Sequence, residues 1–174
     1  YKNIPKNLYA VTGTNGKTSV ASFFNQINHL NKLPCANIGT LGYYLKKTVK
    51  ENNLTTPDNL DIFKFLNFIK RKKVNRAIIE ASSHGLHQGR LSNLKFNSVV
   101  FTNFSRDHLD YHKSLKSYLN AKLILFKKNL KTNSSIICDN GIAKLIRNKV
   151  KKNIKFVIQS KNNPFKILGS KPQG

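Results

Sequence analysis

A short apolar run, a glycine-containing turn and a helix-forming run follow one another within the first 30 residues, and this order constrains the fold more than any other feature. Residues 8–11 are predicted to form a buried strand because they are apolar and lead directly into the turn around Gly13. After Thr18 the apolar residues recur at helical spacing, at Val20, Phe23, Phe24, Ile27 and Leu30. A strand that passes through a tight turn into a helix is typical of α/β proteins.

The rest of the chain continues this alternation. Strands are predicted at residues 36–38, 77–79, 98–101, 135–138 and 154–158, and a hairpin around residues 43–49. Helices are predicted after Asp58 as N-cap, from about Ser114 to Lys127, and near residues 141–148. Their predicted inner faces are Leu60, Phe63, Leu66 and Ile69 in the first, and Leu115, Leu119, Leu123 and Phe126 in the second. The fold class is therefore α/β, with a mainly parallel sheet flanked by helices on both faces.

Three polar segments each follow the end of a predicted strand, at residues 12–18, 80–84 and 102–112. In open parallel sheets, ligands collect beyond the carboxyl ends of the strands. We therefore expect these three segments to meet at one site.

The turn between the first strand and helix has the composition of a phosphate-binding loop. Glycines let backbone N–H groups point at an anion, and the start of a helix adds a favourable dipole. Lys17 supplies a charge for the terminal phosphates, and the Thr18 hydroxyl can bind Mg²⁺. Val11 stands where the general pattern has its first glycine, so the match is imperfect. The predicted nucleotide-binding residues are Gly13, Thr14, Asn15, Gly16, Lys17 and Thr18.

The net charge of +24 raises the hypothesis of a nucleic-acid-binding ATPase. Lysines are scattered along the whole chain without a dominant cluster, and the run at residues 70–73 is typical of a solvated helix end. We therefore expect a solvated surface and no nucleic-acid partner. Nucleic-acid-stimulated ATP hydrolysis with a steep salt dependence would favour the alternative.

Two further compositional features concern the cellular compartment. No apolar run approaches the length needed to cross a bilayer, so no membrane association is expected. Cys35 and Cys138 each lie in an apolar stretch and form no metal-binding pair. Buried free thiols in a reducing compartment are the expected state, which predicts a cytoplasmic protein.

Several blocks, in order along the chain, carry a resemblance to a known family. Thr12-Gly13-Thr14-Asn15-Gly16-Lys17-Thr18 resembles the ATP loop of the Mur ligases and of the related folylpolyglutamate synthetases. Four more blocks, at residues 54–58, 80–86, 88–90 and 101–112, are similar to the MurE type of Mur ligase. Another ligase of this superfamily, of the folylpolyglutamate or cyanophycin type, is the alternative, and residues 82–85 and 88–90 argue against it.

The resemblance covers residues 11–127 and implies an ATP-dependent amide ligase of peptidoglycan biosynthesis. Such an enzyme adds the third amino acid to UDP-N-acetylmuramoyl-L-alanyl-D-glutamate through an acyl phosphate, with ATP and two Mg²⁺ ions. The added amino acid, diaminopimelate or lysine, stays open. Residues 1–174 would be part of the central ATP-binding domain. A UDP-binding domain would precede Tyr1 and an amino-acid-binding domain would follow Gly174, so this piece is expected to be monomeric, to bind nucleotide weakly and not to complete ligation.

The resemblance also assigns catalytic and metal-binding roles. It implies that Thr18 and Glu80 bind one Mg²⁺ ion, and a carboxylate at a strand end suits that cation. A salt bridge from Glu80 to a lysine is the alternative. His108 is implied as a ligand of the second Mg²⁺ ion, together with Lys122 in its N-carbamylated form, which requires a lowered lysine pKa. The implied catalytic residues are Lys17, Lys122 and His108.

The implied substrate contacts are Thr55, Thr56, Ser82, Gln88 and Arg90. Alternatives exist here too, because residues 56–58 could simply start a helix and Gln88 could face solvent. His84 could shape the site or pack as an ordinary buried histidine. His108 and His112 have the spacing of a zinc pair, but Leu109 stands where a zinc protease has glutamate, so His112 is predicted to be structural.

Overall fold

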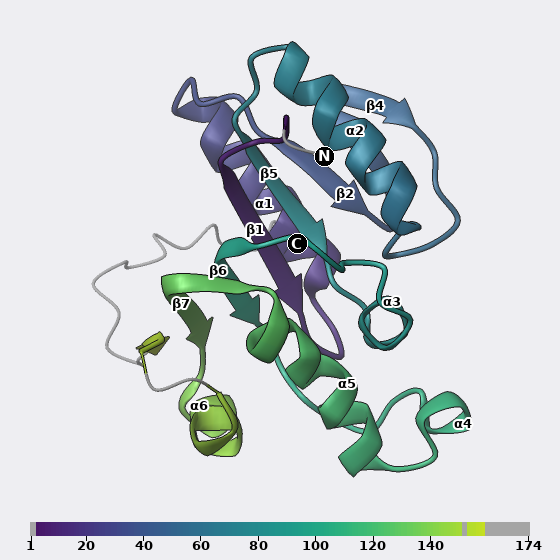
Figure 1. Ribbon diagram of the computed structural model, residues 1–174, viewed down its shortest axis with the longest axis vertical. Coiled ribbons are helices and arrows are strands. Elements are labelled where there is room, and N and C mark those ends of the chain that lie inside the picture. The colour runs from purple at the N-terminus through teal and green to yellow at the C-terminus, as the bar shows by residue number, and fades with distance from the viewer. Residues whose placement is uncertain (1–2, 151–152, 159–174) are drawn as a thin grey trace, which may run out of the picture.

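The computed structural model describes residues 3–150 and 153–158, and these form an α/β fold around one sheet (Figure 1). In this part of the chain the sheet has eight strands in the order β4-β3-β2-β5-β1-β6-β7-β8. The strands are β1 (Asn7–Thr12), β2 (Ala36–Gly39), β3 (Gly42–Leu45), β4 (Lys47–Lys50), β5 (Arg76–Glu80), β6 (Phe96–Phe101), β7 (Leu130–Cys138) and β8 (Lys155–Ile158). The helices are α1 (Lys17–Leu30), α2 (Asn59–Arg71), α3 (Ser83–His87), α4 (Leu109–His112), α5 (Leu115–Lys128) and α6 (Asn140–Ile146), with a 3₁₀ turn at Arg147–Lys149.

The predicted mainly parallel sheet is confirmed. Strands β2, β5, β1, β6, β7 and β8 pair in parallel, and β3 and β4 add the predicted hairpin as an antiparallel edge. The register aligns Val11 with Glu80 and Thr12 with Phe101. The carboxyl ends of β1, β5 and β6 therefore lie at the same level, and the segments that follow them start side by side.

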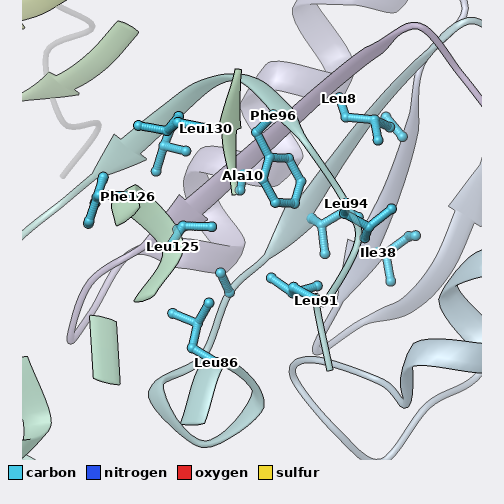
Figure 2. Close-up of a cluster of buried hydrophobic side chains, with 14 of the residues drawn as sticks. Leu8, Ala10, Ile38, Leu86, Leu91, Leu94, Phe96, Leu125, Phe126 and Leu130 are labelled. Carbon is cyan, nitrogen blue, oxygen red and sulfur yellow. The ribbon is translucent and has the colours of Figure 1, made fainter. Parts of the chain in front are cut away.

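Alternating side chains of the strands build one apolar cluster on each face of the sheet. The larger cluster joins the front of the strands to α2, α5 and α6, and Figure 2 shows its centre around Ala10, Phe96 and Leu125. The smaller cluster lies beneath α1, which runs behind the sheet in Figure 1, and contains Val11 and Ile78. Because neighbouring residues in a strand point to opposite faces, Ala10 and Val11 belong to different clusters.

The helix predicted after Thr18 is confirmed as α1, but three of the five apolar residues that indicated it do not face the sheet. Phe23, Ile27 and Leu30 are 61%, 58% and 83% exposed, whereas α1 buries Ala21 and Asn25. The helix meets the sheet through the row that also holds Val20 and Phe24, and it packs mainly over β1, β2 and β5. Periodicity identified a helix, but the helix carries more apolar surface than the described sheet covers.

The other helices largely match prediction. Phe63, Leu66 and Ile69 are buried in α2, and Leu119, Leu123 and Phe126 in α5. Leu60 and Leu115, each in the first turn of its helix, are instead partly exposed, at 51% and 40%.

The helix starts show two ways of using a cap position. Ser114 caps α5 by accepting a hydrogen bond from the Ser117 N–H. Asp58 occupies the N-cap position of α2 but makes no side-chain cap; its carboxylate lies 3.5 Å from Nε of Arg90. The start of α2 is thus tied to the segment that follows α3.

The remaining sequence expectations concern charge, thiols and membranes. Residues 70–73 close α2 and are largely exposed, as predicted for a solvated helix end. Cys35 and Cys138 are buried and free, and burial raises the pKa of the Cys35 thiol to about 12. Within the described residues, no helix has the length and apolar character to cross a membrane.

Candidate active site

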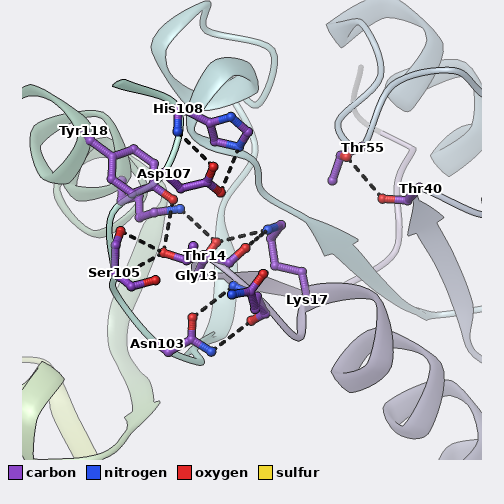
Figure 3. A network of polar contacts seen from close by, with 12 residues as sticks. Gly13, Thr14, Lys17, Thr40, Thr55, Asn103, Ser105, Asp107, His108 and Tyr118 are labelled. Atoms are coloured by element: carbon purple, nitrogen blue, oxygen red, sulfur yellow. Dashed lines mark hydrogen bonds and ion pairs between the residues drawn. The ribbon is translucent and has the colours of Figure 1, made fainter. Parts of the chain in front are cut away.

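The three polar segments that follow β1, β5 and β6 meet at one end of the sheet, as predicted. Figure 3 shows the contacts between the segments after β1 and β6. The Thr14 hydroxyl lies 3.3 Å from the Tyr118 hydroxyl and 3.0 Å from the Ser105 N–H, which donates to it. The Thr12 hydroxyl donates to the carbonyl of Ala81 at 2.8 Å. Side-chain and backbone groups more than 60 residues away in sequence therefore hold the loop after β1 in place.

Backbone conformation explains the two glycines of this loop. Gly13 has φ 149° and Gly16, the N-cap of α1, has φ 80°. Residues other than glycine rarely adopt such positive φ values. A Cβ atom on Gly13 would also overlap the Thr102 hydroxyl. The chain can therefore turn sharply and deliver the start of α1, with its unpaired N–H groups, to the site.

Lys17, the first residue of α1, folds its side chain back over the loop. Its Nζ donates to the carbonyls of Gly13 and Thr14 at 3.0 and 2.8 Å. Burial lowers the Lys17 pKa, while the carboxylates of Glu80 and Asp107 oppose that shift. The ammonium group thus lies against the loop carbonyls, beside the start of α1.

Glu80 ends β5 with a buried carboxylate. Its Oε2 accepts from the Thr18 hydroxyl at 2.8 Å, and the Thr40 N–H donates to Oε1 at 3.2 Å. Burial raises the Glu80 pKa, and the hydrogen bonds from Thr18 and Thr40 oppose that shift. Among the ion pairs of the described residues none involves Glu80, so the alternative of a lysine salt bridge is not found there. A carboxylate beside a hydroxyl is an oxygen donor set that fits Mg²⁺.

Gly39 makes room for this carboxylate. It ends β2 beside β5, and a Cβ atom there would overlap Oε1 of Glu80. Thr40, the next residue, also donates from its hydroxyl to Oε2 of Glu80 or to the Thr55 hydroxyl, at 3.3 and 3.1 Å. Thr40 was not predicted as a site residue; its position directly after a strand end was the available signal.

Lys122 lies on α5 and is only 1% exposed. Its Nζ donates to the Gly13 carbonyl at 2.9 Å and lies 4.5 Å from the centre of the Tyr118 ring. Burial, with a contribution from the Lys17 charge, lowers the Lys122 pKa to about 7. The resemblance singled out a lysine that is buried at the loop and loses its proton readily. Tyr118, one turn before it, was missed.

His108 has a strained backbone conformation, with φ 51°. Its Nε2 is 3.4 Å from Oδ2 of Asp107, and its ring is 4.8 Å from that of His84. In the described ranges, no group of three or more His, Cys, Asp or Glu residues is arranged to hold a metal ion. The metal-binding role of His108 therefore stays a prediction.

His84 and His112 pack together. Their rings are 5.5 Å apart, and burial lowers the pKa of both. His112 is 4% exposed, in keeping with the structural role predicted for it.

The predicted substrate contacts divide into two groups. Thr56, Ser82 and Arg90 are tied together: the Ser82 N–H donates to the Thr56 hydroxyl at 2.9 Å, and Nη1 of Arg90 donates to the Thr56 carbonyl at 2.8 Å. Thr55 is half-buried and Gln88 is exposed, with Nε2 of Gln88 3.4 Å from the Tyr111 hydroxyl. The alternative interpretation of residues 56–58, that they start a helix, is confirmed in part because α2 begins directly after Asp58.

Comparison with known proteins adds an independent finding. The family described as Mur ligase middle domain matches residues 11–171. Three relatives bear the name UDP-N-acetylmuramoyl-L-alanyl-D-glutamate–2,6-diaminopimelate ligase. The one from Brucella melitensis is 46% identical over 72% of this chain and 26% of its own length. Those from Wigglesworthia glossinidia brevipalpis and Rickettsia montanensis are 38% and 40% identical over 92% and 96% of this chain, and 32% and 36% of their own lengths.

Solved structures agree with the sequence matches. A structure of a ligase with the same name superposes with a TM-score of 0.76 at 33% identity, over 88% of this chain and 32% of that one. A complex named FPGS-AMPPCP gives a TM-score of 0.66 at 13% identity, over 90% and 46% of the two chains, which shows a shared fold. The chain thus spans about a third of the length of the curated relatives it matches.

Proposed function

This chain belongs to the Mur ligase family through its middle domain, and from that premise we propose that it is the ATP-binding part of a MurE-type ligase. The proposed reaction adds the third amino acid to UDP-N-acetylmuramoyl-L-alanyl-D-glutamate in peptidoglycan biosynthesis. One observation carries the proposal: Lys17, Lys122 and the Glu80–Thr18 pair surround a glycine loop at the carboxyl end of a parallel sheet. The names of the relatives support 2,6-diaminopimelate as the added amino acid.

The geometry suits the transfer of a phosphoryl group to a carboxylate. In the proposed reaction an oxygen of the peptide carboxylate attacks the γ-phosphorus of ATP, and ADP leaves. The amine of the incoming amino acid then attacks the acyl phosphate, which releases phosphate and forms the amide. Both reactants of the first step are anions, so their approach must be helped by positive charge and by fixed orientation.

The residues of this chain divide that task. The N–H groups at the start of α1 would bind the phosphates. Lys17 would exchange the loop carbonyls of Gly13 and Thr14 for a phosphate oxygen. Glu80 and the Thr18 hydroxyl would hold Mg²⁺, which neutralises phosphate charge when it is bound. Of the predicted substrate contacts, Gln88 is exposed and Thr55, Ser82 and Arg90 are half-buried, and these four would meet the UDP-sugar-peptide, while the buried Thr56 would position Ser82 and Arg90.

We further propose that Lys122 is N-carbamylated and that, with His108, it serves a second Mg²⁺ ion. The neutral amine of Lys122 would attack CO₂ to give a carbamate and release one proton. Its carbonyl partner at Gly13 and the low pKa support this proposal, since only the neutral amine reacts. In the full-length enzyme other domains would bind the uridine nucleotide and the amino acid. The two buried free thiols and the use of ATP support a cytoplasmic enzyme, and we propose that it is a monomer.

The carbamate can be detected directly. In ¹³C-bicarbonate, the chain is expected to show a carbamate carbon resonance whose intensity rises as the pH passes upward through about 7, where Lys122 becomes neutral. The measurement is ¹³C NMR on the wild-type chain and on the Lys122→Arg variant. The N-terminal amine provides an internal control, because its carbamate should appear in both spectra. Identical spectra for the two proteins would rule out carbamylation at Lys122.

The proposed function is tested in two steps. Isothermal titration of the chain with ATP should show binding that Mg²⁺ strengthens. The full-length enzyme should then produce ADP over many turnovers only when UDP-N-acetylmuramoyl-L-alanyl-D-glutamate and diaminopimelate are both present; without diaminopimelate it should form at most one ADP per enzyme. ATP hydrolysis stimulated by nucleic acid, without a response to these substrates, would contradict the proposal and favour a nucleic-acid ATPase.

A further inference from the structure

Asn103, two residues after the end of β6, contacts the phosphate loop at three points. Its backbone carbonyl accepts from the Thr14 N–H at 3.0 Å, and its Oδ1 accepts from the Asn15 N–H at 2.9 Å. Its Nδ2 donates to the Asn15 carbonyl at 3.2 Å. Figure 3 shows the carboxamide of Asn103 facing the loop, on the side away from His108. The side chain therefore pairs with the peptide groups of Asn15 as a neighbouring strand would.

These contacts divide the polar groups of the loop between two tasks. The N–H groups of Thr14 and Asn15 are occupied by Asn103, and the Asn15 carbonyl also accepts from the Thr102 hydroxyl at 2.6 Å. The N–H groups of the first turn of α1, from Lys17 onward, have no carbonyl four residues earlier within the helix. Asn103 thus holds the first half of the loop against the end of β6. The N–H groups at the start of α1 remain available to bind an anion.

We propose that Asn103 is a positioning residue that holds the phosphate loop in its binding conformation without touching the nucleotide. An unanchored loop with two glycines would have to be ordered when the phosphates bind, and that cost would weaken binding. The position needs an acceptor and a donor on one short side chain, which asparagine provides. Aspartate would keep the acceptor but lose the donor. This inference rests on the proposed nucleotide-binding function.

The chain contains a matched control at the other end of β6. Asn97, at the other end of β6, is also half-buried, and its Oδ1 accepts the Leu8 N–H at 3.0 Å. The side chain of each asparagine therefore accepts one backbone N–H from the segment containing β1, but only Asn103 does so at the loop; Asn97 Oδ1 also accepts from Nζ of Lys131 at 2.9 Å. A general loss of stability should follow from either substitution, whereas a change in nucleotide binding should follow from one.

The experiment compares the Asn103→Ala and Asn97→Ala variants with the wild-type chain. Isothermal titration should show that Asn103→Ala weakens MgATP binding about tenfold, as expected for the loss of two hydrogen bonds that order the loop. Hydrogen exchange of the Asn15 amide, measured by NMR without nucleotide, should become faster in the same variant. Asn97→Ala should leave both readouts unchanged even where it lowers the melting temperature. An Asn103→Asp variant retains the acceptor, so its Asn15 amide should stay protected.

Two results would overturn the inference while leaving the proposed function intact: unchanged MgATP affinity in Asn103→Ala, or an equal loss of affinity in Asn97→Ala. Failure of the wild-type chain to bind MgATP would instead contradict the proposed function. In that event hydrogen exchange of the Asn15 amide still tests the role of Asn103. Unchanged exchange in Asn103→Ala would show that Asn103 does not order the loop.

Discussion

Replacing Lys17 by alanine is expected to weaken MgATP binding about a hundredfold, because a hydrogen bond to a charged group inside a partly buried site is among the stronger single contacts in proteins. The Lys17 ammonium already lies over the loop, 3.0 and 2.8 Å from the Gly13 and Thr14 carbonyls, so it needs only a short movement to reach a phosphate. Isothermal titration of both proteins with MgATP measures the effect.

Lys116→Ala is the matched control for this experiment. Lys116 is exposed on α5, so its removal changes the net charge equally without touching the loop. If the Lys116 variant lost as much affinity as the Lys17 variant, the general charge of the protein, and not a contact in the loop, would be responsible.

Replacing Glu80 by glutamine is expected to change nucleotide binding and stability in opposite directions. Glutamine retains the shape of the side chain but offers Mg²⁺ a neutral oxygen. The gain in ATP affinity that Mg²⁺ confers on the wild-type chain should therefore fall by about tenfold or more. Titrations with ATP in Mg²⁺ and in EDTA, for both proteins, give this ratio. Glu51→Gln, at an exposed position, is the control, and a Mg²⁺ effect that survives in Glu80→Gln would contradict the metal-binding role.

The stability of the same variant follows from the Glu80 pKa. Burial raises this pKa in the folded state, so the folded chain holds the proton more tightly than the unfolded chain does. The resulting stabilisation is present below the unfolded pKa and is lost as the pH rises through the folded pKa. At pH 7 the ionised carboxylate therefore destabilises the ligand-free fold, and Glu80→Gln should raise the melting temperature by ~2–4 °C. The difference should shrink near pH 4, and a variant that melts lower than wild type at pH 7 would contradict this account.

The sheet could be predicted from sequence because its strands are short apolar runs that end in polar segments. Residues 8–11, 77–79 and 98–101 each lie within an observed strand, and the polar segments after them meet as expected. The packing of α1 could not be predicted in this way. Its apolar residues cover more than one face of the helix, and periodicity alone does not say which row meets a sheet.

Some residues of the candidate site could be predicted from the sequence, and others could not. The loop from Gly13 to Thr18 has a local signature, because glycine, lysine and hydroxyl must lie close together in sequence to cradle a phosphate. Lys122 has no such signature among 31 basic residues, and only the family resemblance indicated it. Asn103 and Thr40 were missed because each acts through a contact across neighbouring strands, and only the sheet order brings them to the loop and to Glu80.

The Gly13 carbonyl accepts hydrogen bonds from two lysines at once, Lys17 and Lys122. Two amines that share one oxygen cannot change independently, and the charge on Lys17 contributes to the low pKa of Lys122. When a phosphate draws Lys17 away and brings negative charge to the loop, the Lys122 amine should hold a proton more tightly. Nucleotide binding to the unmodified chain is thus linked to proton uptake, which gives any reaction of the neutral Lys122 amine its best opportunity before the nucleotide arrives.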